Sequence, residues 1–125
     1  MANGDITISQ NTVALDAPAF ATGTYVGSAA AINIVLGFVP SMIQIFNDTD
    51  DTEFLWFRGV AAGSMFQRVA AGDRTLVTGG PTLYGDTSDD TYGDSNTATG
   101  QGFTIPAAAS ALNTAADACY FVAWR

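Results

Sequence analysis

Few residues of this chain could carry out acid–base or nucleophilic chemistry. Among its 125 residues are twelve acids, four arginines and one cysteine, with no lysine and no histidine. The usual bases of enzyme catalysis are therefore missing, apart from carboxylates. The sequence also contains no Gly-x-Ser-x-Gly motif, which marks the nucleophile of many hydrolases. We expect that the protein is not an enzyme.

One acidic cluster, formed by Asp48, Asp50, Asp51 and Glu53, could in principle serve a glycosidase. Such an enzyme needs two carboxylates on either side of a sugar. The same residues also suit the solvated turn of a β-hairpin, because Asp and Thr are common turn formers. We favour the hairpin turn.

A second acidic stretch could bind calcium through Asp86, Asp89, Asp90 and Asp94. Calcium prefers oxygen ligands, and Asp48, Asp50 and Asp51 would offer them as well. Neither stretch has the glycine at the sixth position that an EF-hand requires. We favour a polar loop over residues 84–102, and we expect neither a metal nor a cofactor.

The charge balance excludes whole classes of partner. A formal charge of −8 provides no basic surface for nucleic acid or for an anionic membrane. The first five residues lack a secretory signal pattern, and the longest apolar stretch, 29–40, is too short to span a membrane. Cys119 lies in an apolar run, so we expect a buried thiol.

Short strands dominate the predicted secondary structure. The central one follows Pro40, whose fixed φ favours the start of a strand over a helix interior. Its residues 42–47 and the stretch 53–58 are spaced as a β-hairpin. Further strands are expected at 5–9, 12–16, 29–36, 64–69, 74–78, 102–106 and 118–125. Residues 18–27 and 107–118 are expected to be connections, the first with a brief extended piece at 24–26.

This pattern predicts an all-β fold, an antiparallel β-sandwich or jelly-roll-like single domain over residues 21–125 with an N-terminal extended arm over residues 1–20. Its strands are apolar on both faces. Phe54 and Trp56 point one way while Leu55 and Phe57 point the other. A lone two-layer sandwich needs apolar residues only on its inner faces. A second cover is therefore expected, from another subunit or, in part, from the N-terminal strands or the alanine-rich segment.

The strand pattern resembles a group of small β-sandwich virion proteins of tailed bacteriophages. The resemblance covers residues 31–125 and depends on three short motifs. They are Gly37-Phe38-Val39-Pro40 before an Ile-x-Ile strand, Gly102-Phe103-x-Ile105, and Leu112-Asn113 followed by Tyr120-Phe121-Val122-Ala123-Trp124. An aromatic strand followed by a glycine-rich turn also matches. Proteins of this group decorate or cement capsids or form parts of tail tips, and the resemblance provides no catalytic residue.

The resemblance implies a capsid decoration or cement protein that binds the outer surface of the virion, after synthesis in the bacterial host cytoplasm. Its expected partners are the phage major capsid protein and further copies of itself, a homotrimer being preferred because capsids offer three-fold positions. The candidate contact residues are Ile6, Ile8, Phe54, Trp56 and Trp124. The alternative is a carbohydrate- or receptor-binding module of a tail fibre or tail tip, with Trp56, Tyr84 or Tyr92 stacking on sugar rings.

The N-terminal arm has too few apolar residues for a core of its own, because an isolated hairpin is only marginally stable in water. It must therefore add to the edge of a sheet, in its own subunit or in a neighbour. We favour exchange with a neighbour or with the capsid, since residues 17–27 look long and flexible enough to reach out. An arm that folds back on its own sheet is the alternative.

Overall fold

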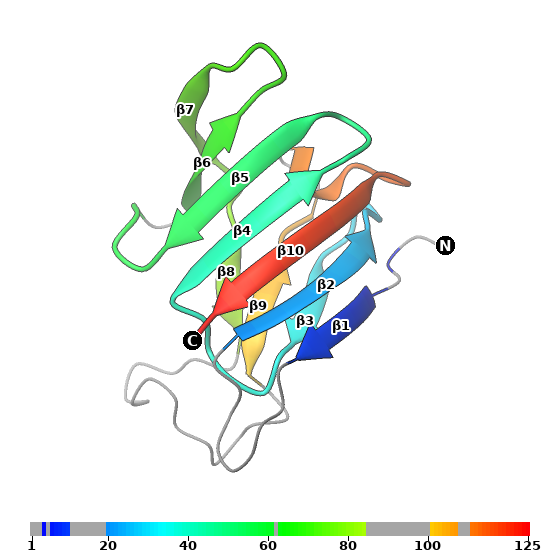
Figure 1. Cartoon of the computed structure of the whole chain (residues 1–125), viewed down its shortest axis with the longest axis vertical. Helices are drawn as coiled ribbons and strands as arrows, with labels where there is room; N and C mark the ends of the chain where they lie inside the picture. The colour runs from blue at the N-terminus through cyan, green and yellow to red at the C-terminus, as the bar shows by residue number, and fades with distance from the viewer. Residues whose placement is uncertain (1–3, 5, 11–19, 62, 85–100, 108–110) are drawn as a thin grey trace.

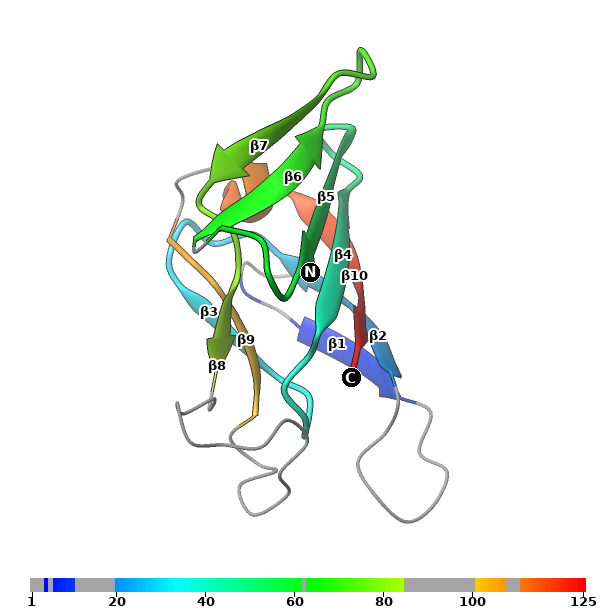
Figure 2. The same ribbon diagram turned by 90° about the vertical axis from the view of Figure 1, so that its left-hand side faces the viewer.

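The computed structural model describes residues 4, 6–10, 20–61, 63–84, 101–107 and 111–125, and they form two facing antiparallel sheets (Figures 1 and 2). The larger sheet has seven strands in the order β1-β2-β10-β4-β5-β6-β7, and the smaller has three in the order β3-β9-β8. The expected all-β sandwich is confirmed. Within the described ranges, no helix is long and apolar enough to cross a membrane.

The strands are short and are joined mainly by turns. In the larger sheet they are β1 (Ile6–Gln10), β2 (Phe20–Val26), β4 (Met42–Asn47), β5 (Thr52–Phe57), β6 (Ser64–Arg68), β7 (Arg74–Thr78) and β10 (Ala118–Trp124). In the smaller sheet they are β3 (Ile32–Val35), β8 (Thr82–Tyr84) and β9 (Gly102–Ile105). A single turn of 3-10 helix, η2 (Ala111–Asn113), precedes β10.

β4 occupies the middle of the larger sheet, as expected for the strand that follows Pro40. The predicted hairpin is confirmed, because β4 and β5 pair from Met42 with Phe57 to Asn47 with Thr52. The Asn47 side-chain oxygen accepts a hydrogen bond from the Asp50 backbone N–H at 2.9 Å. This bond closes the turn that carries the first acidic cluster.

The core lies between the two sheets and is filled by aromatic and branched side chains. Ile43 and Ile45 of β4 are each 1% exposed. The rings of Phe103 and Phe121, one from each sheet, meet edge to face with centroids 5.4 Å apart. A Cβ atom added to Gly23 would come within 2.7 Å of the Phe121 ring, so that position has room only for glycine.

η2 closes one end of the core through buried polar contacts. The Asn113 side chain donates to the carbonyls of Ala30 and Pro106, each at 2.8 Å, and accepts from the Ser28 N–H at 2.8 Å. The Tyr25 hydroxyl donates to the Leu112 carbonyl at 2.7 Å. The expected irregular connection over 107–118 therefore contains residues whose hydrogen bonds attach it to the core.

Two expectations about strands were wrong. Residues 20–26 form a full strand between β1 and β10, where a loose connection was expected. Gly23 interrupts the alternation of this strand because its inner side is filled by the ring of Phe121, from the adjacent strand β10 of the same sheet. β8 was not expected at all, since its three residues are too few to show alternation.

The N-terminal strand lies on its own sheet. β1 pairs with β2 from Ile6 with Tyr25 to Gln10 with Ala21, so the structure has the folded-back arm and not the favoured exchange. Most of the connection 17–27, which was expected to reach a neighbour, forms strand β2. The strand expected at 12–16 and the acidic loop at 84–102 lie outside the described residues, apart from the loop's two ends.

Candidate functional site: the outer face of the seven-stranded sheet

The register of the larger sheet sorts its side chains into an inner and an outer set. Directly paired residues of antiparallel strands share a face, and that face alternates along each strand. We call the set that points away from the smaller sheet the outer face. On its five strands from β10 to β7 it comprises Ala118, Tyr120, Val122, Trp124, Met42, Gln44, Phe46, Glu53, Leu55, Phe57, Ser64, Phe66, Arg68, Arg74, Leu76 and Thr78.

Large apolar side chains on this face are open to solvent. The exposed fractions are 38% for Phe46, 39% for Phe57, 48% for Tyr120 and 52% for Leu76. No described element crosses in front of the sheet in Figure 1. The expectation of strands that are apolar on both faces is confirmed. Contiguous exposed apolar surface on a small protein marks an interaction site.

Neither of the two segments named as a cover, the N-terminal strands and the alanine-rich segment, lies over this face within the described part of the chain. β1 extends the edge of the sheet beside β2 and does not fold over it. η2 lies on the inner side, where Leu112 is fully buried. Covering the outer face would therefore require residues from outside the described structure or another molecule.

A shallow groove of about 350 Å³ runs across the face over β4, β5 and β6. Its apolar wall is formed by Leu55, Phe57 and Phe66, and the two phenylalanine rings stack with centroids 6.2 Å apart. Gln44, Glu53, Arg68 and Arg74 line the rest of it. The groove thus combines ring faces with hydrogen-bonding and charged groups.

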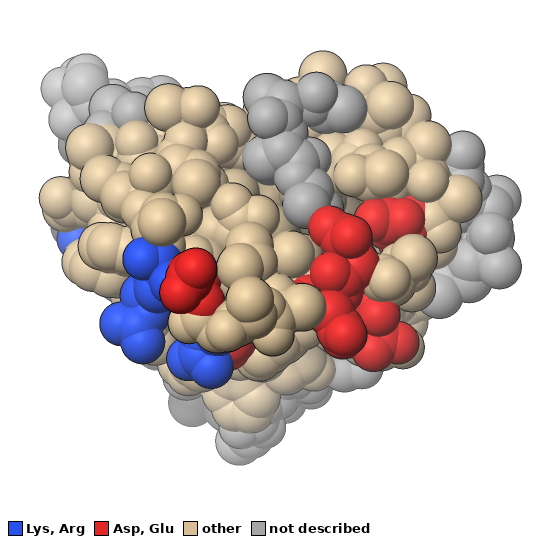
Figure 3. Space-filling view, turned by 90° about the horizontal axis from the view of Figure 1, so that it is seen from above, with Lys and Arg blue, Asp and Glu red and all other residues tan. Residues whose placement is uncertain are grey.

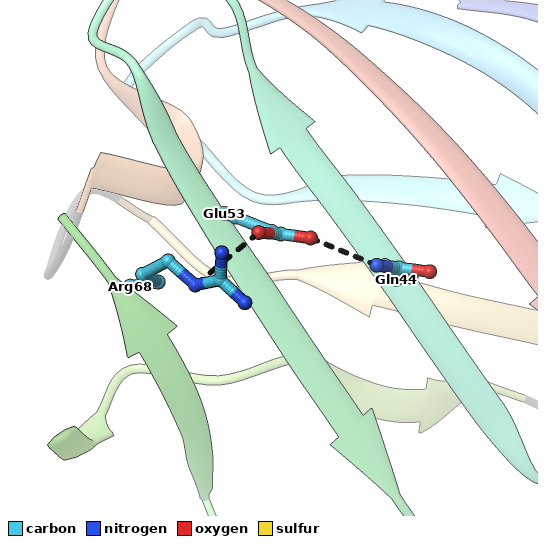
Figure 4. Close-up of polar contacts among 3 residues, drawn as sticks. All are labelled: Gln44, Glu53 and Arg68. Atoms are coloured by element: carbon cyan, nitrogen blue, oxygen red, sulfur yellow. Dashed lines mark hydrogen bonds and ion pairs between the residues drawn. The ribbon is translucent and has the colours of Figure 1, made fainter. Parts of the chain in front are cut away.

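Figure 4 shows how the polar side chains of the groove hold one another. The Gln44 amide donates to Glu53 Oε2 at 2.9 Å, and Arg68 Nε lies 3.6 Å from Glu53 Oε1. Arg68 is also paired directly with Arg74 across β6 and β7. Glu53 therefore pairs with one of two neighbouring guanidinium groups, that of Arg68.

Of the five predicted contact residues, only Trp124 lies on the outer face. Phe54 and Trp56 were wrong, because they are 1% and 9% exposed and belong to the core. They pair with Ile45 and Ile43, which point inward. Alternation in the sequence separates the two faces of β5 but does not say which faces in.

The other two candidates, Ile6 and Ile8, lie on the inner side of the edge strand β1. They pair with Tyr25 and Gly23, which share that side. Ile8 packs against the core, and Ile6 is 36% exposed at the border of the sheet. Their register therefore places both side chains on the inner face of the sheet.

The acidic residues form no metal-binding group in the described ranges. Asp48, Asp50 and Asp51 are exposed in the β4–β5 turn, while Glu53 points to the groove and holds Gln44 and Arg68. Among the residues described, no three His, Cys, Asp or Glu side chains gather closely enough to hold a metal ion. The calcium candidates Asp86, Asp89, Asp90 and Asp94 lie outside these ranges.

The single cysteine is a core residue, as expected. Cys119 is 1% exposed, and burial raises the pKa of its thiol to about 11. Burial also raises the pKa of the neighbouring Tyr25 hydroxyl, which is held by the Leu112 carbonyl. Both groups therefore stay protonated near neutral pH and serve packing.

No family model matches the chain, and no match is found among curated proteins or among solved structures.

Proposed function

We propose that this chain is a structural protein of a phage particle, namely a capsid decoration protein that binds the outer capsid surface and stabilises it by bridging subunits. The observation that carries the proposal is the apolar outer face, left open by the described residues. Such a face is costly for a soluble monomer and useful for a protein that acts by adhesion. The motifs around Gly37 and Gly102 support a particle of the phage type.

The size of the outer face suits a protein interface. Seven strands about 4.8 Å apart span roughly 30 Å, and strands of five to seven residues are about 17–23 Å long. A standard interface buries about 800 Å² on each partner. The outer face therefore offers room for about one interface of ordinary size, and the edge strands offer additional contacts.

The charge of the chain supports an exterior position on the capsid. With a formal charge of −8, a position against packaged nucleic acid would add repulsion from the phosphates. The acidic segment 85–100 would face solvent, because burying its carboxylates without cations would be costly. The partner on the particle would be the major capsid protein.

A second candidate function is a carbohydrate- or receptor-binding module of a tail tip. The groove favours it, because Phe57 and Phe66 offer ring faces beside the amide of Gln44 and the charges of Glu53 and Arg68. Trp56 cannot be the stacking residue, since it is buried in the core. Tyr92 lies outside the described residues, as does the side chain of Tyr84.

Copy number on purified particles tests the proposal and separates the two functions. A decoration protein should be present in hundreds of copies per virion, and adding it to capsids that lack it should raise their melting temperature. A tail-tip module should be present in few copies and should bind glycans or host cells in isolation. Low copy number together with no effect on capsid melting would contradict decoration.

A further inference from the structure

Two charged groups lie at the same end of the larger sheet. The acidic turn, Asp48, Asp50 and Asp51, joins β4 to β5, and the basic pair consists of Arg68 at the end of β6 and Arg74 at the start of β7. β4 and β6 both run antiparallel to β5, so both end at this end of the sheet. Seen from above in Figure 3, basic atoms gather on one side and most acidic atoms on the other.

The charges of both groups remain largely uncompensated within the described part of the chain. Arg68 has Glu53 at 3.6 Å, while Arg74, which is exposed, forms no ion pair with a described residue. The three aspartates of the acidic turn are exposed and also form no ion pair there. Two guanidinium groups directly opposite each other are unfavourable unless an anion joins them. The basic pair therefore favours a partner that brings carboxylates.

We infer that a second copy of this chain covers the outer face, related by a two-fold axis that runs along the strands near β5. Rotation about such an axis leaves the position of every group along the strand direction unchanged. It exchanges the β10 and β7 ends of the strand order. The basic pair of each copy then faces the acidic turn of the other. The inference rests on the proposed assembly role of the outer face, and it names the molecule that covers this face.

The distribution of apolar side chains matches this contact. An axis near β5 places β4 and β10 of one copy over β6 and β7 of the other. Val122 and Leu76, which is 52% exposed, lie at the same level of the register and then face each other across the interface. Tyr120, which is 48% exposed, faces Arg74. Outside the overlap, the outer residues in the middle of β1 and β2 are threonines: Thr7, Thr22 and Thr24.

The two-fold contact requires a surface that is complementary to itself. A ring of three copies with head-to-tail contacts would not require such a surface. In an isologous interface each patch meets its counterpart twice, once in each direction. Sheets packed face to face keep their strands within about 30° of each other, so the two charged ends stay together. The structure thus favours a two-fold pair over the trimer expected from capsid symmetry.

Charge reversal on each side, followed by mixing, tests the contact. The unchanged 125-residue chain should be a dimer at micromolar concentration by analytical ultracentrifugation and native mass spectrometry. R68E/R74E should bring two acidic patches together, and D48K/D50K should bring two basic patches together. Each variant alone should dimerise at least tenfold more weakly, and an equimolar mixture should form the mixed dimer. Asp51 is left unchanged because its φ of 56° disfavours a longer side chain.

A matched control adds two acidic residues to the other sheet, as V35E/T82E, at exposed positions of its outer side. This variant should dimerise like the unchanged chain. A monomeric or trimeric unchanged chain, or folded variants that fail to associate when mixed, would overturn the inference. A monomer that still coats capsids would overturn this inference alone, whereas a dimer that never binds capsids would overturn only the proposed decoration.

Discussion

The two sheets of this sandwich have opposite outer sides. On the three-stranded sheet the outward residues are Asn33, Thr82 and Thr104, with Val35 as the single exposed aliphatic residue among those described. On the seven-stranded sheet the outward residues are mostly aromatic or aliphatic. Both sheets fill the same core with their inner sides.

The difference shows that folding does not require apolar residues on the outer side of a sheet. Alternation along each strand satisfies the core equally well with polar or apolar outward residues. The three-stranded sheet has the solvated outer side that a free sandwich should have. The apolar outer face of the larger sheet therefore needs an explanation from binding, and the following predictions test that conclusion.

The largest expected contrast is between two neighbouring residues of β5. Trp56→Ala removes a core side chain and should lower the free energy of unfolding by about 3–5 kcal/mol. Phe57→Ala removes a side chain of the outer face and should change folding of the monomer by less than about 1 kcal/mol. Urea unfolding at several protein concentrations measures both, because association adds a concentration-dependent term. Equal losses for the two variants would contradict the assignment of faces.

A second prediction tests the inner side of the larger sheet through pH. The pKa of Cys119 is raised to about 11 in the folded chain, so its contribution to stability is complete below the ordinary thiol pKa. That contribution falls as pH rises and is lost through pH 11, for a total of about 2–3 kcal/mol. The raised pKa of Tyr25 acts in the same direction.

Urea unfolding measured from pH 7 to pH 11 checks this loss. Cys119→Ala should reduce the slope of the free energy of unfolding against pH but not abolish it, because the variant lacks the thiol and keeps Tyr25. The ultraviolet absorbance of the thiolate gives the Cys119 pKa directly. A folded protein whose thiol ionises near its ordinary pKa would show that water reaches the inner side of β10.

The third prediction compares one exposed aliphatic residue on each outer side. Leu76 is 52% exposed on the larger sheet, and Val35 is 39% exposed on the smaller one. Leu76→Asn should weaken dimerisation about tenfold, close to 1.4 kcal/mol, because it removes apolar contact from the interface. Val35→Asn should leave the dimerisation constant within about twofold. A larger effect of Val35→Asn than of Leu76→Asn would indicate that the interface lies on the three-stranded sheet.

Much of the fold could be predicted because its signals are local. The β4–β5 hairpin follows from the spacing of two apolar stretches around a polar turn, and Cys119 was placed in the core by its apolar neighbours. β2 was missed because Ala21 and Gly23 interrupt the alternation of large apolar residues along it. The glycine at position 23 is required by the Phe121 ring, which belongs to a strand almost a hundred positions later in the chain.

The site was predicted only in part, for a similar reason. The sequence shows that β5 is apolar on both sides, but the choice between them depends on how β4 pairs with its other neighbour. Trp56 was named as a contact residue together with Phe54, which shares its face of β5. It lies inside because Ile43, its partner, lies inside. The basic pair was not foreseen, since Arg68 and Arg74 meet only through the register of β6 and β7.

The smallest expected effect concerns the polar side of the sandwich. The Thr104 hydroxyl donates to the Asn33 side-chain oxygen at 2.8 Å on the exposed side of the three-stranded sheet. Thr104→Val keeps the shape and strand propensity of the side chain but removes this bond. The free energy of unfolding should fall by about 0.5 kcal/mol, because Asn33 can bond to water instead.

The neighbouring residue provides the control for this change. Thr82 pairs with Thr104 across β8 and β9 and forms no side-chain hydrogen bond with a described residue. Thr82→Val makes the same chemical change and should leave the free energy of unfolding unaltered. Both variants should dimerise like the unchanged chain. Weaker dimerisation of either variant would show that the three-stranded sheet also takes part in assembly, and the contrast between the two outer sides would then no longer locate the interface.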